Sequence, residues 1–125
     1  MAVGYSTAHA DAMLGLLDGH FVQLHSGDPG PNGTANVLNP SSGRATLTLA
    51  AGTTSTTNRV RDNSAQLSYT GALAGTISHF SVWSAVTAGT FKQSGTISPT
   101  KTVNAGDNFT IAVGDLDFLI GPLAQ

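Results

Sequence analysis

Residues 44–50, RATLTLA, show the pattern that decides the fold, because apolar and polar side chains alternate along them with a period of two. On an extended chain Ala45, Leu47 and Leu49 would share one face, and the two threonines between them the other. Such alternation is typical of a strand that is buried on one side. The same period recurs in FVQLH (21–25), AQLSY (65–69), TISHFSVWS (76–84), TFKQSG (90–95), GTISPTKTV (95–103) and NFTIAV (108–113). We therefore predict a mainly β protein.

Turn residues separate these segments at short intervals, as in Asp28-Pro29-Gly30, Asn32-Gly33, Asp62-Asn63 and Ala88-Gly89. Short strands with frequent turns indicate an antiparallel β-sandwich, jelly-roll-like, with about seven or eight strands. Residues 50–59, AAGTTSTTNR, fit either a mobile loop or a threonine-rich edge strand. Within residues 76–84, strict alternation would put Ile77, His79, Ser81 and Trp83 on one face, and we expect this tryptophan to lie in the core.

One short N-terminal α-helix is predicted in residues 6–19, STAHADAMLGLLDG. Ser6 or Thr7 can cap its start, and Gly19 can adopt the left-handed conformation that closes it. Its expected apolar stripe consists of Ala8, Ala12, Met13, Leu16 and Leu17. A helix of about eleven residues is unstable alone, so the stripe should pack on the sheet.

Composition agrees with a β protein and excludes several functions. Only 10% of residues are charged, against about 25% in an average domain, while glycine occurs 15 times and threonine 16 times. Five basic residues and a net charge of -2 cannot neutralise a phosphate backbone, so no nucleic-acid partner is expected. Weak repulsion between copies favours self-association. The absence of cysteine excludes disulfides and thiolate zinc sites.

The expected organisation is a single β-sandwich domain over residues 1–125, with an N-terminal arm and helix over 1–19. Residues 114–125, GDLDFLIGPLAQ, form a possible C-terminal arm that either completes the core, which we favour, or packs on a neighbour. The N-terminus has neither a charged leader nor a long apolar run. We expect no membrane partner.

Patterns for catalysis or metal binding are weak. His9, His20, His25 and His79 include no pair at the helical spacing of a zinc site. Asp115 and Asp117 would face one side of an extended chain, but the spacing of a calcium loop is missing. No nucleophile elbow is present, and the glycine-rich residues 27–36 have no cation and lead into no helix, unlike a phosphate loop. We predict no enzyme, no cofactor and no metal, and a stiffened turn at residues 26–36.

Two stretches resemble a group of small virion proteins of tailed phages, especially phages of actinobacteria. The first is VQLHSGDPGPNGTANVL (22–38), in which Leu24, His25, Gly27, Asp28, Pro29 and Gly30 match a Leu-His-Thr-Gly-Asp-Pro-Gly motif, with Ser26 in place of threonine. The second is residues 77–116, in which Trp83, Val103, Ala105, Gly106 and Asp107 match a tryptophan-ended strand and a Val-x-Ala-Gly-Asp turn.

The resemblance implies a virion structural protein made in the host cytoplasm. A compact domain standing alone favours a decoration protein on the outer capsid surface that stabilises the head, binding the major capsid protein and itself as a homotrimer. A tail or tail-tip structural protein is the alternative, and a host-receptor or glycan-binding module is a third. The predicted partner-binding residues are Ala2, Val3, Tyr5, His25, Asp28, Pro29, Pro31, Asn32, Phe118 and Ile120.

Overall fold

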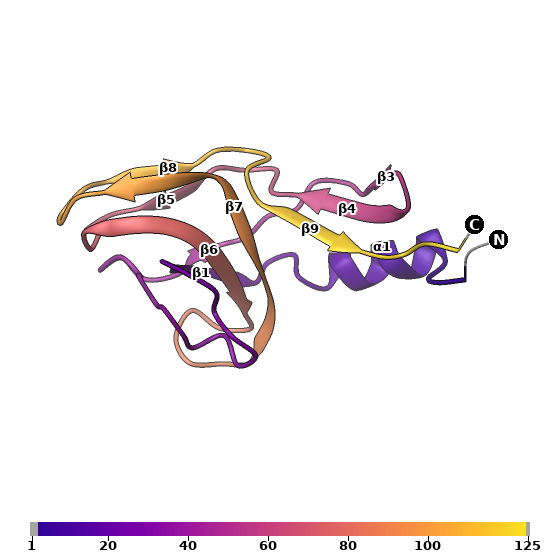
Figure 1. The fold of residues 1–125 in the computed structure, drawn as a ribbon, viewed down its shortest axis with the longest axis horizontal. Helices are drawn as coiled ribbons and strands as arrows, with labels where there is room; N and C mark the ends of the chain where they lie inside the picture. The colour runs from indigo at the N-terminus through magenta and orange to yellow at the C-terminus, as the bar shows by residue number, and fades with distance from the viewer. Residues whose placement is uncertain (1–2, 125) are drawn as a thin grey trace.

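The computed structural model describes residues 3–124 and is mainly β, with antiparallel sheets and one short helix, as the sequence predicts (Figure 1). The helix is α1 (Thr7–Gly15). The strands described are β1 (Phe21–His25), β2 (Ala45–Thr46), β3 (Thr53–Ser55), β4 (Asn58–Asp62), β5 (Leu67–Tyr69), β6 (Gly75–Trp83), β7 (Phe91–Val103), β8 (Phe109–Ile111) and β9 (Asp117–Ile120). This is more than the seven or eight strands expected, since residues 50–59 contribute to the β3–β4 hairpin.

A four-stranded sheet in the order β2-β1-β6-β7 forms the larger layer. β1 pairs with the end of β6 over its whole length, from Phe21 opposite Trp83 to His25 opposite His79. The two predicted segments at residues 90–103 are one continuous strand, β7, which lies at the edge of this sheet.

The two-stranded β5-β8 sheet covers the inner face of the larger layer and completes a sandwich. Leu67 and Ile111 of this sheet are buried in the same core cluster as Leu24 and Phe80 of the larger sheet. The hydroxyl of Tyr69, on β5, donates a hydrogen bond across the core to the Val22 carbonyl at 3.1 Å. This bond gives a buried phenol the partner that it needs.

A break in the pairing of β6 and β7 corrects the expected face of residues 76–84. The register shifts between Ile77 and His79, so that Ile77 joins Phe80 and Val82 in the core. Ser81 and Trp83 then lie on the opposite, outer face, and Trp83 is buried outside the main core. Strict alternation fails here because a bulge moves all later side chains to the other face.

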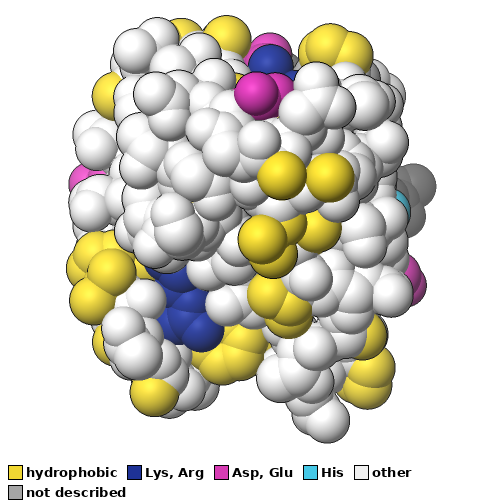
Figure 2. Space-filling view, turned by 90° about the vertical axis from the view of Figure 1, so that its left-hand side faces the viewer, with side chains coloured by type: hydrophobic (Ala, Val, Ile, Leu, Met, Phe, Trp, Pro, Cys, Tyr) yellow, Lys and Arg dark blue, Asp and Glu magenta, His cyan; other side chains and the backbone are white. Residues whose placement is uncertain are grey.

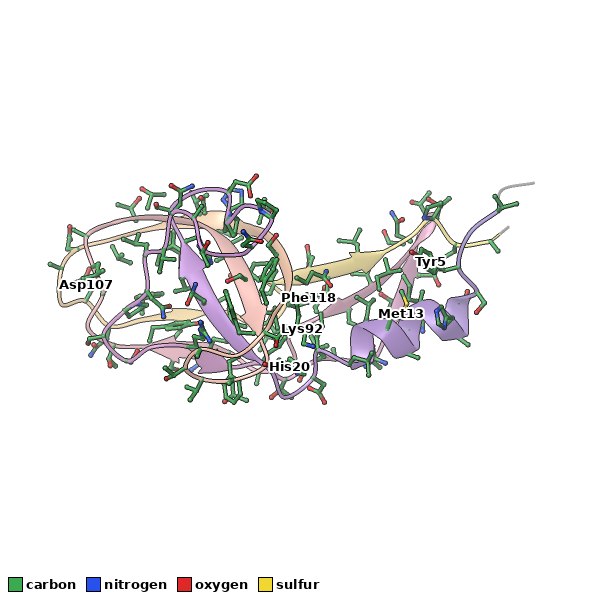
Figure 3. The ribbon with its side chains drawn as sticks, turned by 90° about the horizontal axis from the view of Figure 1, so that it is seen from below. Tyr5, Met13, His20, Lys92, Asp107 and Phe118 are labelled. Atoms are coloured by element: carbon green, nitrogen blue, oxygen red, sulfur yellow. The ribbon has the colours of Figure 1, made fainter. Side chains whose placement is uncertain are left out.

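The remaining strands form a β3-β4-β9 sheet, on which α1 packs. This sheet and the helix make the narrower part of an elongated molecule, and both chain ends lie at its tip (Figures 1 and 3). The predicted tail is therefore a core strand: Leu116 and Phe118 are fully buried, and the Phe118 ring meets Phe80 edge-on at 5.1 Å.

The helix begins and turns as predicted but buries a different face. The Ser6 hydroxyl accepts a hydrogen bond from the His9 amide at 3.1 Å, and Gly19 has a φ of 80°. Its buried residues are Ala10 and Leu14, continued by Leu17, whereas Leu16 is 73% exposed. The helix ends at Gly15, earlier than predicted, and Gly19 lies in the turn that follows. Of the expected stripe, Leu17 is buried and Met13 half-buried, whereas Ala8, Ala12 and Leu16 are exposed, because the sheet covers the face that carries Ala10 and Leu14.

Asn63 links the sandwich to the narrower part of the molecule, which consists of α1 and the β3-β4-β9 sheet. It is fully buried, and its side-chain amide donates to the carbonyls of Ala65 at 3.0 Å and Ala112 at 2.9 Å. Its side-chain oxygen accepts from the amides of Gly114 at 3.1 Å and Leu116 at 3.0 Å. The chain leaving β4 is thus tied to the chain between β8 and β9. The sequence predicted only a turn at this position.

Candidate functional site

The loop at residues 26–36 is a closed turn held by hydrogen bonds of its own backbone and side chains. The Ser26 amide donates to the Asn36 carbonyl at 2.8 Å, which joins the two ends of the loop. The Asp28 carboxylate accepts from the Gly30 amide at 2.8 Å, and Asn36 donates to the Asp28 carbonyl at 2.9 Å. Gly30 has a φ of 77°, which only glycine adopts without strain. The prediction of a stiffened turn is confirmed.

The loop is fastened to the outer face of the large sheet through His25. One ring nitrogen of His25 bonds the Ala35 carbonyl at 2.8 Å, and the other lies 2.7 Å from the Ser81 hydroxyl. The Trp83 indole donates to the same hydroxyl at 2.7 Å. All groups are satisfied when Ser81 donates to Nε2 of His25 and Nδ1–H donates to Ala35. His25 and Ser81 have no exposed surface, so this pair supports the loop from below.

Arg44 completes this outer layer. Its guanidinium lies 4.4 Å from the centre of the Trp83 ring, and it donates to the carbonyls of Ala85 at 2.8 Å and Ala88 at 2.6 Å. It thereby fastens the β6–β7 loop, as His25 fastens the 26–36 loop. Trp83 is 8% exposed and offers no open stacking platform. Sequence reasoning missed this layer because it depends on three segments far apart in the chain.

Burial of His25 has a consequence for stability. Burial is the main cause that lowers its pKa below the ordinary 6.5, and His79 and Arg44 lower it further, against a hydrogen bond to Ala35 that raises it. The unfolded chain therefore binds a proton near pH 6.5 more readily than the folded chain does. This contribution to stability is complete above pH 6.5 and is lost as the pH falls below it.

We expect the free energy of unfolding to fall from pH 7.5 to pH 5.5 more steeply in the wild type than in His25→Gln. Urea titrations of both proteins at several pH values measure this difference, and contributions from other groups cancel in the comparison. Equal slopes for the two proteins would show that His25 does not couple protonation to folding.

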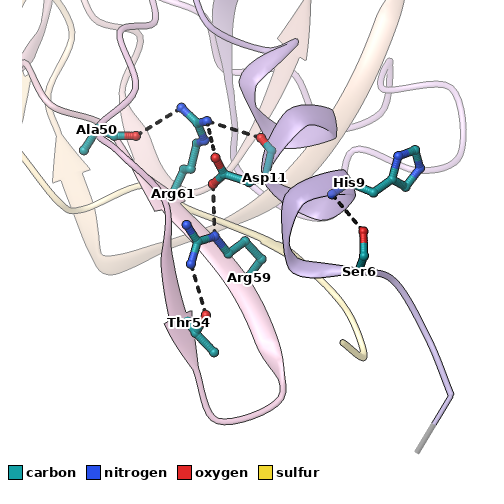
Figure 4. A network of polar contacts seen from close by, with 7 residues as sticks. All are labelled: Ser6, His9, Asp11, Ala50, Thr54, Arg59 and Arg61. Atoms are coloured by element: carbon teal, nitrogen blue, oxygen red, sulfur yellow. Dashed lines mark hydrogen bonds and ion pairs between the residues drawn. The ribbon is translucent and has the colours of Figure 1, made fainter. Parts of the chain in front are cut away.

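Asp11 holds the helix onto β4 through two arginines (Figure 4). Its carboxylate binds Arg59 at 3.0 Å and Arg61 at 2.8 Å. Arg59 also donates to the Thr54 hydroxyl at 3.0 Å, and Arg61 reaches the Ala50 carbonyl at 3.5 Å. The hydrogen bond from Arg59 is the main cause that lowers the pKa of Asp11, supported by Arg61 and opposed by partial burial. Both arginines are thus engaged within the chain.

A pair of carboxyl groups lies at the junction of the two parts. Asp62 of β4 is directly opposite Asp117 of β9. Burial and the neighbouring Asp117 raise the pKa of Asp62 from 3.8 to about 6. The folded protein therefore holds this proton more tightly than the unfolded chain does. The stabilisation is complete below pH 3.8 and is lost as the pH rises through about 6.

Replacing Asp62 by asparagine should therefore raise the free energy of unfolding at pH 7.5 by about 1 to 2 kcal/mol, allowing for solvent screening. Near pH 3.5 the variant should match the wild type. Asp107→Asn is the control, because an amide oxygen can still accept the bond that Asp107 receives from the Asn104 amide at 2.8 Å. An Asp62→Asn protein that is no more stable than the wild type at pH 7.5 would contradict a strained carboxyl pair.

The predicted contact residues divide into exposed and buried groups. Asp28, Pro31 and Asn32 are exposed on the loop, whereas His25 and Pro29 are buried beneath it. Phe118 is fully buried and is not available to a partner, and Ile120 is half-buried and only partly available.

The predicted terminal contacts lie together at the narrow tip. Val3 is 86% and Tyr5 40% exposed, and Ala2 lies outside the described residues. Tyr5 pairs with Leu123, and its amide donates to the Pro122 carbonyl at 3.0 Å. The structure thus brings the two predicted arms side by side.

Residues 3–124 were compared with the patterns of metal ligands and of membrane-spanning helices. No three histidine or acidic side chains there are grouped as a metal site would require, and the helix is too short to cross a bilayer.

The fold is a small antiparallel β module, and the polar side chains described above mostly bind other groups of the same chain. A family model described as podophage GP4 fiber I protein gp80 matches residues 16–119. Because the match spans most of the chain, the protein belongs to this family and is a phage virion structural protein. A comparison with curated proteins found no match. The part played by the Leu24–Gly30 motif stays a prediction.

Proposed function

We propose that this protein is a structural component of a phage tail fibre. The observation that carries the proposal is the family match, whose description names a fiber protein and which covers residues 16–119. That description favours the tail-side alternative over capsid decoration, which the sequence alone led us to prefer. The decoration role is not confirmed and stays a prediction.

A fibre component acts through contacts with other proteins, and two features support such a role. Loops on the outer face of the large sheet are fastened from below by His25 and Arg44, which favours a surface of constant shape. Figure 2 shows the end of the molecule away from the chain termini, where small hydrophobic groups are scattered among mostly uncharged atoms. A surface with few charges is inexpensive to desolvate when it meets another protein.

We propose a mechanical role without catalysis. His25 and Ser81 are the kind of pair that could act as base and nucleophile, and they lie 2.7 Å apart. Both are fully buried, and Ser81 already accepts a bond from Trp83. Because no substrate could reach the buried pair, its burial supports a structural role for both residues.

Quantitative mass spectrometry of purified virions tests the location. A tail-fibre component should be present at a copy number comparable with other tail proteins and should co-purify with detached tails. A copy number approaching that of the major capsid protein would overturn the proposal and support capsid decoration. The predicted homotrimer is tested separately, by light scattering on the purified protein.

A further inference from the structure

A groove lies between β7 and β9, where the sandwich meets the β3-β4-β9 sheet. Among the described residues, β7 pairs along its length with β6 alone, and β9 with β4 alone. A single antiparallel bridge, between Ile97 and Leu116, joins β7 to the chain that enters β9. Beyond it the groove has a volume of about 380 Å³ and is lined by Gln93, Ser94, Gly95, Thr96, Asp117 and Leu119. Unpaired strand edges bind an additional extended strand through their backbone groups.

A second hollow lies between β7 and the end of the helix. It has a volume of about 360 Å³, shares Gln93 with the first and adds Met13, Leu16, Leu17, His20 and Lys92. Figure 3 places Phe118, Lys92 and His20 where the broad and narrow parts of the molecule meet. The edge of β7 is therefore accessible from both hollows, and its outer residues Lys92, Ser94 and Thr96 are exposed.

The wall formed by β9 carries uncompensated negative charge. No lysine, arginine or histidine in residues 3–124 lies within 4.0 Å of the carboxylates of Asp62 or Asp117. One Asp62 oxygen is buried without a hydrogen-bond partner. Like charges directly opposite on neighbouring strands repel, so a cation beside them would be favourable. Leu119, 49% exposed, adds an apolar contact on the same wall.

The protein's own cations are poorly placed to supply this charge. Arg59 and Arg61 bind Asp11, and Arg44 lies on Trp83 with bonds to two carbonyls. The two lysines both belong to β7, the strand that forms the other wall. A second copy could offer a lysine only on its own β7, which is paired with β6 along its other edge, so a whole sheet would have to enter a groove of about 380 Å³. A different polypeptide with an exposed basic residue fits the groove better.

We propose that the groove receives an extended segment of a different virion polypeptide, which pairs with the edge of β7 and places a lysine or arginine side chain beside Asp117. Backbone pairing supplies the affinity, and the charge selects the register of the segment. The proposal rests on the structural role in the virion and applies equally to a tail or a capsid position.

Photo-crosslinking in assembled particles tests the occupant directly. Phage is grown with Ser94 replaced by p-benzoylphenylalanine, and in a parallel preparation with Leu73 replaced, since Leu73 is 53% exposed on a segment outside the groove. After irradiation, mass spectrometry reads the sequence attached at each position. We expect Ser94 to capture a peptide of another virion protein with a lysine or arginine within about two residues of the attachment point, the next position on the same face. The Leu73 position should not capture that peptide.

Capture of another copy of this chain at Ser94, capture of a segment without a basic residue, or no capture would each overturn the proposal. None of these results depends on whether the protein is counted in the tail or on the head, so failure of the groove and failure of the fibre role are distinguishable.

A matched pair of variants tests the groove without a probe. Leu119→Arg fills it and offers the carboxylates an internal cation, while Leu73→Arg makes the same change elsewhere. Both replaced residues are about half exposed, so both variants should fold, which circular dichroism checks. We expect Leu119→Arg to lower the copy number per particle about tenfold, the effect of losing about 1.4 kcal/mol of binding. Normal incorporation of folded Leu119→Arg, or a loss equal to that of Leu73→Arg, would contradict the proposal.

Discussion

Replacing Asn63 by alanine is expected to lower the free energy of unfolding by about 2 to 4 kcal/mol. The variant removes the side-chain partner of the Ala65 and Ala112 carbonyls, which are partly buried, and of the buried Leu116 amide. The Gly114 amide keeps the Asn63 backbone carbonyl as its partner at 3.1 Å. Each unsatisfied buried group costs about 1 to 3 kcal/mol, with partial relief from water that enters the space. Urea unfolding followed by tryptophan fluorescence and circular dichroism measures the loss.

Asn63→Asp separates hydrogen bonding from packing. An aspartate has nearly the same shape but cannot donate to Ala65 and Ala112 when ionised, so it should be at least as damaging at neutral pH. Asn108→Ala is the matched control, because Asn108 is exposed, and it should change stability by less than about 0.5 kcal/mol. If Asn63→Ala and Asn108→Ala were equally stable, the four bonds would contribute nothing.

Replacing Phe118 by alanine should cost about 3 to 5 kcal/mol, as expected when a buried aromatic ring leaves a cavity. Phe118 is fully buried on β9, and its ring meets Phe80 of the large sheet edge-on. This contact is one of the links between the narrow part of the molecule and the sandwich. Loss of the ring should therefore loosen both parts.

Leu119→Ala is the control for Phe118→Ala, since Leu119 is the next residue on the same strand and is 49% exposed. It should cost less than about 1 kcal/mol. Thermal unfolding and hydrogen exchange of the β4 and β9 amides measure both variants. A mild effect for Phe118→Ala would mean that the tail packs on the core only weakly, as the alternative of a C-terminal arm requires.

Features governed by neighbouring residues could be predicted from the sequence. The alternation at residues 44–50 identified buried Leu47 and Leu49, although only Ala45–Thr46 form a regular strand. Ser6 caps the helix and Gly19 takes a positive φ because both depend on local backbone geometry. The hydrogen bond from the Gly30 amide to the Asp28 carboxylate is local in the same way.

Features that depend on register or on distant segments could not be predicted. The bulge after Ile77 depends on how β7 pairs with β6, and it moves Trp83 to the outer layer. The helix buries Leu14 in place of Leu16 because the sheet beneath it sets which face is covered. No local pattern distinguishes Asn63, a buried link, from an ordinary turn asparagine.

The sequence by itself therefore determined the class of this protein: alternation, turns and low charge specify an antiparallel β structure with one capped helix, and its motifs indicated a virion component. Only the tertiary structure decided which polar residues are internal fastenings and which surfaces are free. His25, which looked like a contact residue, is a buried support, whereas Asp117 faces an open groove between two strand edges. The physical reason is that burial and charge compensation depend on residues brought together from distant segments, while strand and turn formation depend on adjacent ones.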